Sequence, residues 1–130
     1  MLELVTIVVR DYDEAIRFYV DLLGFELVED SPAVTERGEP KRWVVVRPPG
    51  RETGLLLARA DGPTQAAAVG NQVAGRVGFF LRVDDFDTVF DRLVAAGCEI
   101  HRQPRDEPYG RVAVFADVAG NRWDLLGPTG

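Results

Sequence analysis

The sequence predicts an α+β fold made of two tandem β-α-β-β-β modules. The first observation is a repeat: an apolar run at residues 4–9 precedes Asp11-Tyr12-Asp13, and a second run at 78–83 precedes Asp85-Phe86-Asp87. One constant offset (85 − 11 = 74) separates the two acidic clusters. A helical pattern follows each cluster, and three short strand-like stretches follow each helix. Each half therefore contains one strand, one helix and three strands.

The predicted helices carry matching apolar stripes. In the second half the stripe has the spacing i, i+3, i+4, i+7, i+8 and consists of Phe86, Val89, Phe90, Leu93 and Val94. The same slots in the first half hold Tyr12, Ala15, Ile16, Tyr19 and Val20. Asp11 with Glu14 fits a capping pair at the first helix start. Gly24 and Gly97 stand where a left-handed C-cap is expected.

Three strands are expected after each helix, separated by Pro-, Gly- and Asn-containing turns. They are predicted at 25–29, 43–47 and 55–58 in the first half, and at 98–102, 111–116 and 122–126 in the second. Module one covers about 1–60, a connector about 61–75, and module two about 76–130. The connector is rich in Ala and Gly and is predicted to carry a short helix at Gln65–Val69. The length of 130 residues suits one such domain.

Composition excludes several classes of function. The formal net charge is −6 and the pI about 4.7, which disfavours nucleic-acid binding, and no polybasic run is present for membrane attachment. The one cysteine, Cys98, excludes an intramolecular disulfide and is more easily explained as a small core residue than as a nucleophile. Without a signal peptide pattern or a long apolar run, we expect a cytoplasmic protein that binds neither nucleic acid nor membrane.

The duplicated pattern resembles the vicinal oxygen chelate superfamily, which includes glyoxalase I, extradiol dioxygenases and bleomycin-resistance proteins. The resemblance covers nearly the whole chain and is carried by residues 9–11, 17–19, 23–25, 83–85, 95–97, 109–110 and 117–121. It implies two modules that form a U-shaped, cleft-bearing mixed sheet, and it implies a homodimer. Because this superfamily supports several chemistries on one scaffold, it does not by itself specify a reaction.

Enzymes of this superfamily hold a divalent metal with His and Glu side chains on the first and last strands of the modules. The resemblance places two of those ligand slots at Leu4 and Gly78, which cannot bind a metal. The last strand of the first half has no carboxylate between Glu52 and Asp61, so only Asp124, in the final slot, is a candidate ligand. Glu3 is expected to point away from the face of Leu4. We therefore expect no metal and no other cofactor.

The candidate catalytic residues are Asp124, His101 and Tyr109. His101 is the single histidine; it is most simply a strand residue, although its intrinsic pKa suits a general base. Tyr109 and Gln72 lie in segments that could close over a cleft, and both also suit ordinary turns. The acidic runs at 11–14 and 84–87 are explained as favourable charges at helix N-termini rather than as metal sites.

Strand alternation assigns residues to two faces. The face toward the helices is predicted to carry Val5, Ile7, Val9, Val44, Val46, Phe79, Leu81, Val83, Val112, Val114, Trp123 and Leu125. The opposite face is predicted to carry Leu4, Thr6, Val8, Val45, Gly78, Arg82 and Arg122, together with six candidate ligand-binding residues: Trp43, Arg47, Phe80, Arg111, Phe115 and Asp124. Such a mixture of aromatic and charged groups is typical of a small-molecule pocket. Arg47 and Arg111 could bind a carboxylate or phosphate, or could instead lie in solvent near strand ends. A register slip of one residue would reverse any strand's assignment.

Two functions from different classes fit this pattern. The first is a metal-free, bleomycin-resistance-like protein that binds a small organic molecule in the cleft. The alternative is a lyase, isomerase or dioxygenase with a rebuilt site that uses Asp124, His101, Tyr109 and Arg111. A third possibility is a scaffold that uses the cleft as an interface with a partner.

Overall fold

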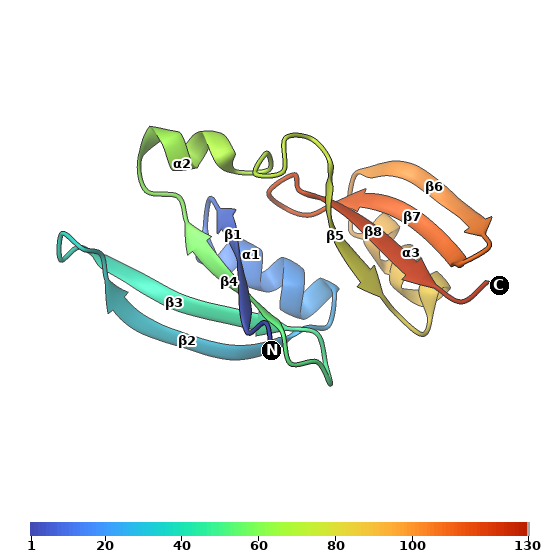
Figure 1. Ribbon diagram of the computed structural model, residues 1–130, viewed down its shortest axis with the longest axis horizontal. Helices are drawn as coiled ribbons and strands as arrows, with labels where there is room; N and C mark the ends of the chain where they lie inside the picture. The colour runs from blue at the N-terminus through green and yellow to red at the C-terminus, as the bar shows by residue number, and fades with distance from the viewer. Residues whose placement is uncertain (130) are drawn as a thin grey trace. The chain divides into compact units, whose positions relative to one another are not determined.

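The structure, a computed structural model, describes residues 1–129 and divides the chain after Val69 into two compact units. Each unit contains one four-stranded mixed sheet with a helix between its first two strands, as Figure 1 shows. The predicted α+β class with two tandem β-α-β-β-β modules is therefore confirmed.

Unit 1 has the strand order β1-β4-β3-β2, with β1 parallel to β4 and the other pairs antiparallel. Its elements are β1 (Leu4–Val9), α1 (Tyr12–Ile16), η1 (Arg17–Leu22), β2 (Glu26–Val34), β3 (Pro40–Arg47), β4 (Gly54–Arg59) and α2 (Gly62–Ala68). The α2 helix begins three residues before the predicted Gln65 and buries none of its residues. The Gln65 side chain instead accepts a hydrogen bond from the backbone N–H of Asp61 at 2.9 Å.

Unit 2 repeats this topology with the order β5-β8-β7-β6 and β5 parallel to β8. Its elements are β5 (Val77–Arg82), α3 (Phe86–Ala95), β6 (Ile100–Glu107), β7 (Gly110–Ala116) and β8 (Arg122–Gly127). Among the helices of residues 1–129, none is long and apolar enough to cross a membrane.

The helix ends form as predicted. Asp11 accepts a hydrogen bond from the N–H of Glu14 at 2.7 Å, and Asp85 accepts one from the N–H of Thr88 at 3.2 Å. The Thr88 hydroxyl also donates to Asp85, and these two bonds lower the pKa of the Asp85 carboxyl. Gly24 and Gly97 take positive φ values of 77° and 78° after their helices.

The first helix departs from the predicted stripe in its second half. Residues Arg17–Leu22 form a π-helix, in which the N–H of Leu23 donates to the carbonyl of Phe18, five residues earlier. The wider turn buries Phe18 beside Tyr19, with ring centroids 5.2 Å apart. Ile16 and Val20, expected in the core, are only half-buried.

Each sheet has an inner face, which packs on its own unit's helix, and an outer face on the other side. In unit 1 the inner face has the predicted residues, with Ile7, Val9, Val44 and Val46 almost completely buried. In unit 2, Trp123 and Leu125 lie on the inner face with Phe79, whose ring stacks on Trp123 at 4.8 Å.

The face assignment of β7 was wrong. Phe115 pairs directly with Trp123 and stacks on it with centroids 6.1 Å apart, so it lies on the inner face and is fully buried. Arg111 is also on the inner face, 5.5 Å above the Phe86 ring of α3. Val112 and Val114 therefore point to the outer face, yet both are buried. Because the run from Val112 to Ala116 is apolar throughout, alternation carried no information about which side faces the helix.

Candidate ligand-binding site

The outer face of unit 1 presents an aromatic and a basic side chain on β3. Arg42 lies over the Tyr12 ring on the inner face, 5.1 Å from its centroid, so the next residue, Trp43, points outward. Trp43 is 37% exposed, and Arg47 follows four residues later on the same face. The predicted placement of these two residues thus agrees with the strand register.

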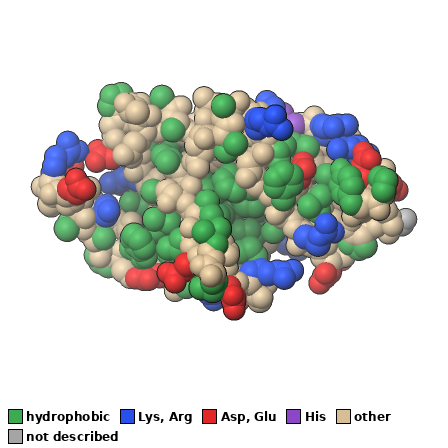
Figure 2. Space-filling view, in the orientation of Figure 1, with side chains coloured by type: hydrophobic (Ala, Val, Ile, Leu, Met, Phe, Trp, Pro, Cys, Tyr) green, Lys and Arg blue, Asp and Glu red, His purple; other side chains and the backbone are tan. Residues whose placement is uncertain are grey.

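A groove of about 440 Å³ runs over this face. It is lined by Met1, Glu3, Leu4, Val28, Glu29, Trp43, Val45, Arg47, Arg51, Glu52 and Gly54. We call it the outer groove. Its lining comes from the residues before β1, from β1, β2 and β3, from the β3–β4 turn and from the first residue of β4, all within unit 1. Figure 2 shows charged side chains of both signs interspersed with hydrophobic ones on the visible surface.

The outer groove contains charges of both signs. Arg47 donates to Glu26 at 3.3 Å through Nη2, and its Nε is buried without a hydrogen-bond partner. Glu3 was expected to point away from the face of Leu4, but both residues line the groove, so that expectation was wrong; Glu29 and Glu52, which also line it, were missed. Glu3 precedes the first strand, where strand alternation does not apply, and Glu52 lies in a turn. The groove can therefore accept a ligand that carries both donors and acceptors.

The outer face of unit 2 has a carboxylate at its centre. Asp124 pairs with Phe80 on one side and Val114 on the other. Burial raises the pKa of the Asp124 carboxyl, while the positive charges of Arg105 and Arg102 act in the opposite direction. Phe80 is 64% exposed. Two predicted ligand-binding residues, Phe80 and Asp124, are thus direct neighbours.

The three candidate catalytic residues occupy different places in unit 2. His101 lines a polar cavity of about 240 Å³ with Glu99 and Arg122, but Asp124 is not part of that lining. The Nε2 of His101 lies 3.6 Å from Glu99 Oε1. Tyr109 sits in the β6–β7 turn and is 59% exposed. The structure shows no shared cavity for these three side chains among the pockets it forms in residues 1–129.

A buried carboxylate that sequence reasoning did not single out organises the turn before β8. Asp117 is 5% exposed and accepts hydrogen bonds from the backbone N–H groups of Ala119 and Asn121. It also accepts from the Asn121 amide at 2.9 Å and the Trp123 indole at 3.2 Å. Burial, with a further contribution from Asp117, raises the pKa of the nearby Cys98 thiol, which disfavours its reactive thiolate form.

Comparison with known proteins identifies the family. A family model described as the Glyoxalase/Bleomycin resistance protein/Dioxygenase superfamily matches residues 2–125. The chain belongs to this superfamily. An uncharacterized protein of Shewanella frigidimarina is 50% identical over 123 residues, which are 94% of this chain and 89% of the relative.

Two solved structures of similar proteins align with almost the whole length of this chain. UcmS2 is 30% identical with a TM-score of 0.78, over 97% of this chain and 96% of the other. TnmS3, an antibiotic-binding protein from Streptomyces sp. CB03234, is 32% identical with a TM-score of 0.76, over 99% and 96% of the two chains.

The side chains at the superfamily's metal-ligand positions do not fit a divalent cation. Leu4 and Gly78 offer no ligand atom, and β4 presents Leu56, opposite Thr6, at the position where β8 has Asp124. Within residues 1–129, no three His, Cys, Asp or Glu side chains gather in a metal-binding arrangement. A single carboxylate does not make a closed or an open catalytic metal site, so we derive no chemistry through a metal.

Proposed function

We propose that this glyoxalase-superfamily protein binds a small, partly aromatic organic molecule in the outer groove, without a metal and without altering the molecule chemically. The observation that carries the proposal is that Trp43 and Arg47, with Val45 between them on the same strand, line one groove. An indole offers a flat apolar surface for stacking, and the Arg47 guanidinium offers charged donors for an acceptor group.

The size and charge of the groove support this function. A volume of about 440 Å³ lies within the range of roughly 300–1,000 Å³ that is usual for small-molecule pockets. Six of the eleven lining residues are apolar or glycine and five are charged, so the groove can contact the apolar surface of a ligand and orient its polar groups by hydrogen bonds. The similarity to TnmS3, an antibiotic-binding protein, makes an antibiotic-like aromatic molecule a reasonable first ligand class.

The proposal also covers the oligomeric state of the protein and its location in the cell. We propose that two copies of the chain form a homodimer, because the superfamily resemblance implies one. We also propose a cytoplasmic location, because the chain has one cysteine and a net charge of −6.

The test uses the dye 8-anilinonaphthalene-1-sulfonate as an aromatic anionic probe, with binding followed by isothermal titration calorimetry. We expect Trp43→Ala and Arg47→Ala each to weaken binding about tenfold, the equivalent of about 1.4 kcal/mol. Tyr109→Ala is the matched control, since it removes an exposed aromatic ring that lies outside the groove. Unchanged affinity in both Trp43→Ala and Arg47→Ala would contradict the proposal, as would loss of the probe to a reaction product after long incubation.

One observation favours an enzyme as the second candidate. A carboxyl whose pKa is raised by burial, as at Asp124, can serve as a general acid or base. Such an enzyme would be a lyase, isomerase or dioxygenase of the same superfamily. Its turnover should vanish in Asp124→Asn while the circular dichroism spectrum stays unchanged, and retained turnover would refute the role.

A further inference from the structure

The sheets of the two units differ where β3 begins and β4 ends. In unit 2 the β7–β8 ladder continues through Val112–Leu126 to Arg111–Gly127. In unit 1 the equivalent ladder stops at Val44–Leu57, and the next two pairs of residues are absent from the register. The strands are therefore separated before Val44 in β3 and after Leu57 in β4, although both units have the same topology.

A cavity of about 320 Å³ occupies this separation, and we call it the fork pocket. Trp43 lines it from β3, Ala58 and Arg59 line it from β4, and Tyr12 lines it from the start of α1. The fork pocket shares Trp43 with the outer groove but is otherwise lined by different residues.

The fork pocket contains a buried hydroxyl that can donate. Tyr12 is 4% exposed, and its oxygen accepts a hydrogen bond from the backbone N–H of Arg42 at 3.3 Å. No acceptor for the hydroxyl hydrogen is present among residues 1–129. Because an unsatisfied buried donor is costly, an acceptor on a ligand at this point would stabilise the complex.

Two cations in the lining have no ion pair among the described residues. Arg59 lies over the Tyr12 ring, 5.2 Å from its centroid, and forms no salt bridge; neither does Lys41, the single lysine of the chain. Arg42 differs, because Asp30 at 2.7 Å and Asp13 at 2.9 Å neutralise it. The charges available to a ligand are therefore those of Arg59 and Lys41.

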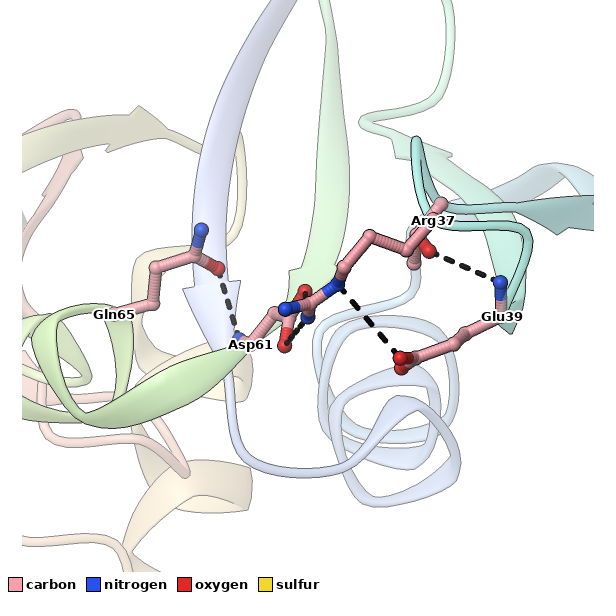
Figure 3. Close-up of polar contacts among 5 residues, drawn as sticks. Arg37, Glu39, Asp61 and Gln65 are labelled. Carbon is pink, nitrogen blue, oxygen red and sulfur yellow. Dashed lines mark hydrogen bonds and ion pairs between the residues drawn. The ribbon is translucent and has the colours of Figure 1, made fainter.

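Two of the acids in the lining are already engaged. Figure 3 shows Arg37 between Asp61 and Glu39, with Nη2 3.2 Å from Asp61 Oδ2 and Nε 3.7 Å from Glu39 Oε1. Arg37 thus connects the β2–β3 hairpin tip to the segment that follows β4. Glu36 is the remaining acid in the lining. The unpaired charges, two basic against one acidic, favour an anionic ligand.

We propose that the fork pocket is a second binding site, specific for a small aromatic monocarboxylate. The carboxylate accepts hydrogen bonds from the Tyr12 hydroxyl and the Arg59 guanidinium, with Lys41 adding a positive charge. The aromatic ring lies against Trp43. The cavity limits the ligand to about the size of a one- or two-ring acid.

The fold alone does not require this pocket, because unit 2 lacks it. The residue equivalent to Tyr12 is Phe86, which has no hydroxyl, and the residue equivalent to Arg59 is Gly127. A Cβ on Gly127 would lie 2.7 Å from the Phe86 Cβ, so that site is closed by direct packing. Unit 1 therefore carries a donor, a cation and an opening that its own repeat does not have.

Benzoate is the probe, titrated into the ¹⁵N-labelled full chain with the shifts of backbone amides as the readout. We expect shifts at Arg42 and at residues 58–60, and none at 51–54, which border only the outer groove. Tyr12→Phe and Arg59→Gln should each weaken benzoate binding at least tenfold. Phe86 shows that phenylalanine is accommodated at the position equivalent to Tyr12, so Tyr12→Phe should fold normally.

Two matched variants separate the fork pocket from the outer groove, and two matched ligands test the chemistry of the fork pocket. Arg51→Gln changes a groove residue and should leave benzoate binding unchanged, whereas Arg47→Ala should affect only the dye. Benzamide lacks the negative charge, and cyclohexanecarboxylate has a saturated ring in place of the aromatic one, so both should bind more weakly than benzoate. Equal affinity for benzamide, unchanged binding in Arg59→Gln, shifts confined to 51–54, or no shift at concentrations on the order of 10 mM would each overturn the proposal.

Discussion

The two units of this chain share one topology but differ in chemistry at matching positions. On the outer face, the central row of unit 1 is Thr6, Leu56 and Val45, and that of unit 2 is Phe80, Asp124 and Val114. The scaffold is unchanged by these substitutions because outward side chains do not enter the core on the helix side. The outer faces are thus free to diverge while the hydrogen-bonded ladders stay the same.

The inner faces differ at the ring that begins each helix. Tyr12 lies beneath two arginines, Arg42 and Arg59, whereas Phe86 lies beneath Arg111 and packs on Gly127. A long side chain at Arg59 is compatible with separated strands, and a glycine at the matching position allows the strands to remain paired. In this chain the separated strand end thus has an arginine where the paired strand end has a glycine.

The largest effect is expected in the β7–β8 turn of unit 2, which contains Asp117. The corresponding β3–β4 turn of unit 1 contains Pro48-Pro49-Gly50 instead. Asp117→Ala leaves the N–H of Asn121 and the indole of Trp123 without their acceptor, so the free energy of unfolding should fall by at least about 2 kcal/mol. Urea unfolding, monitored by Trp fluorescence, measures this change in the free energy of unfolding. Glu52→Ala, which removes an exposed acid from the matching turn of unit 1, should change stability by less than about 0.5 kcal/mol. Similar losses in both variants would contradict the comparison.

The next effect compares the two positions that control strand pairing. Gly127→Ala should lower the free energy of unfolding by about 1–3 kcal/mol, because the new Cβ overlaps Phe86. Arg59→Ala should cost no more than about 1 kcal/mol, the usual size of a cation–π contact at an exposed site. Differential scanning calorimetry of both variants tests the contrast, and a larger loss in Arg59→Ala than in Gly127→Ala would contradict it.

The smallest effect concerns the outer-face residue that differs between the repeats. The raised pKa of Asp124 means that its protonated form favours the folded state, a contribution present below the unfolded pKa and lost as the pH rises through the folded one. Asp124→Leu, which installs the residue of unit 1, should therefore gain stability relative to the parent as the pH rises, by less than about 1 kcal/mol.

The pH dependence is measured by urea unfolding at a series of pH values below and above the ordinary range of an aspartate. Asp124→Asn is the isosteric control, because it removes the titrating carboxyl without adding an apolar side chain. It should abolish the same pH dependence of the free energy of unfolding. If both variants retain the pH dependence of the parent, another carboxyl is responsible for it.

Local patterns in the sequence predicted much of the fold. The offset repeat, the acidic clusters at the helix starts and the glycines at the helix ends placed the two helices, and the Pro-, Gly- and Asn-containing turns placed the three strands after each. Helix caps and turns could be predicted because they depend on contacts within a few residues. Where both faces of a strand are apolar, as in β7, the alternation of side chains does not show which face packs on the helix. For this reason Phe115 was placed on the wrong face.

The candidate site was predicted in part. Trp43, Arg47, Phe80 and Asp124 lie on outer faces as expected, whereas Arg111 and Phe115 do not. Of the acids in the outer groove, Glu3 precedes the first strand, Glu52 lies in a turn and Glu29 lies in β2 next to a register shift, so strict strand alternation does not place them. Whether any of these residues binds a ligand stays a prediction for the experiments above.

The sequence by itself determined the number of modules, the order of their elements and the caps of their helices, because each depends on the chemistry of neighbouring residues. Only the tertiary structure decided that β3 separates from β4, that Tyr12 lies between two arginines, and that Asp117 collects four donors in one turn. Those features join residues distant in the chain or depend on strand register, and register is set by the packing of the whole sheet against its helix.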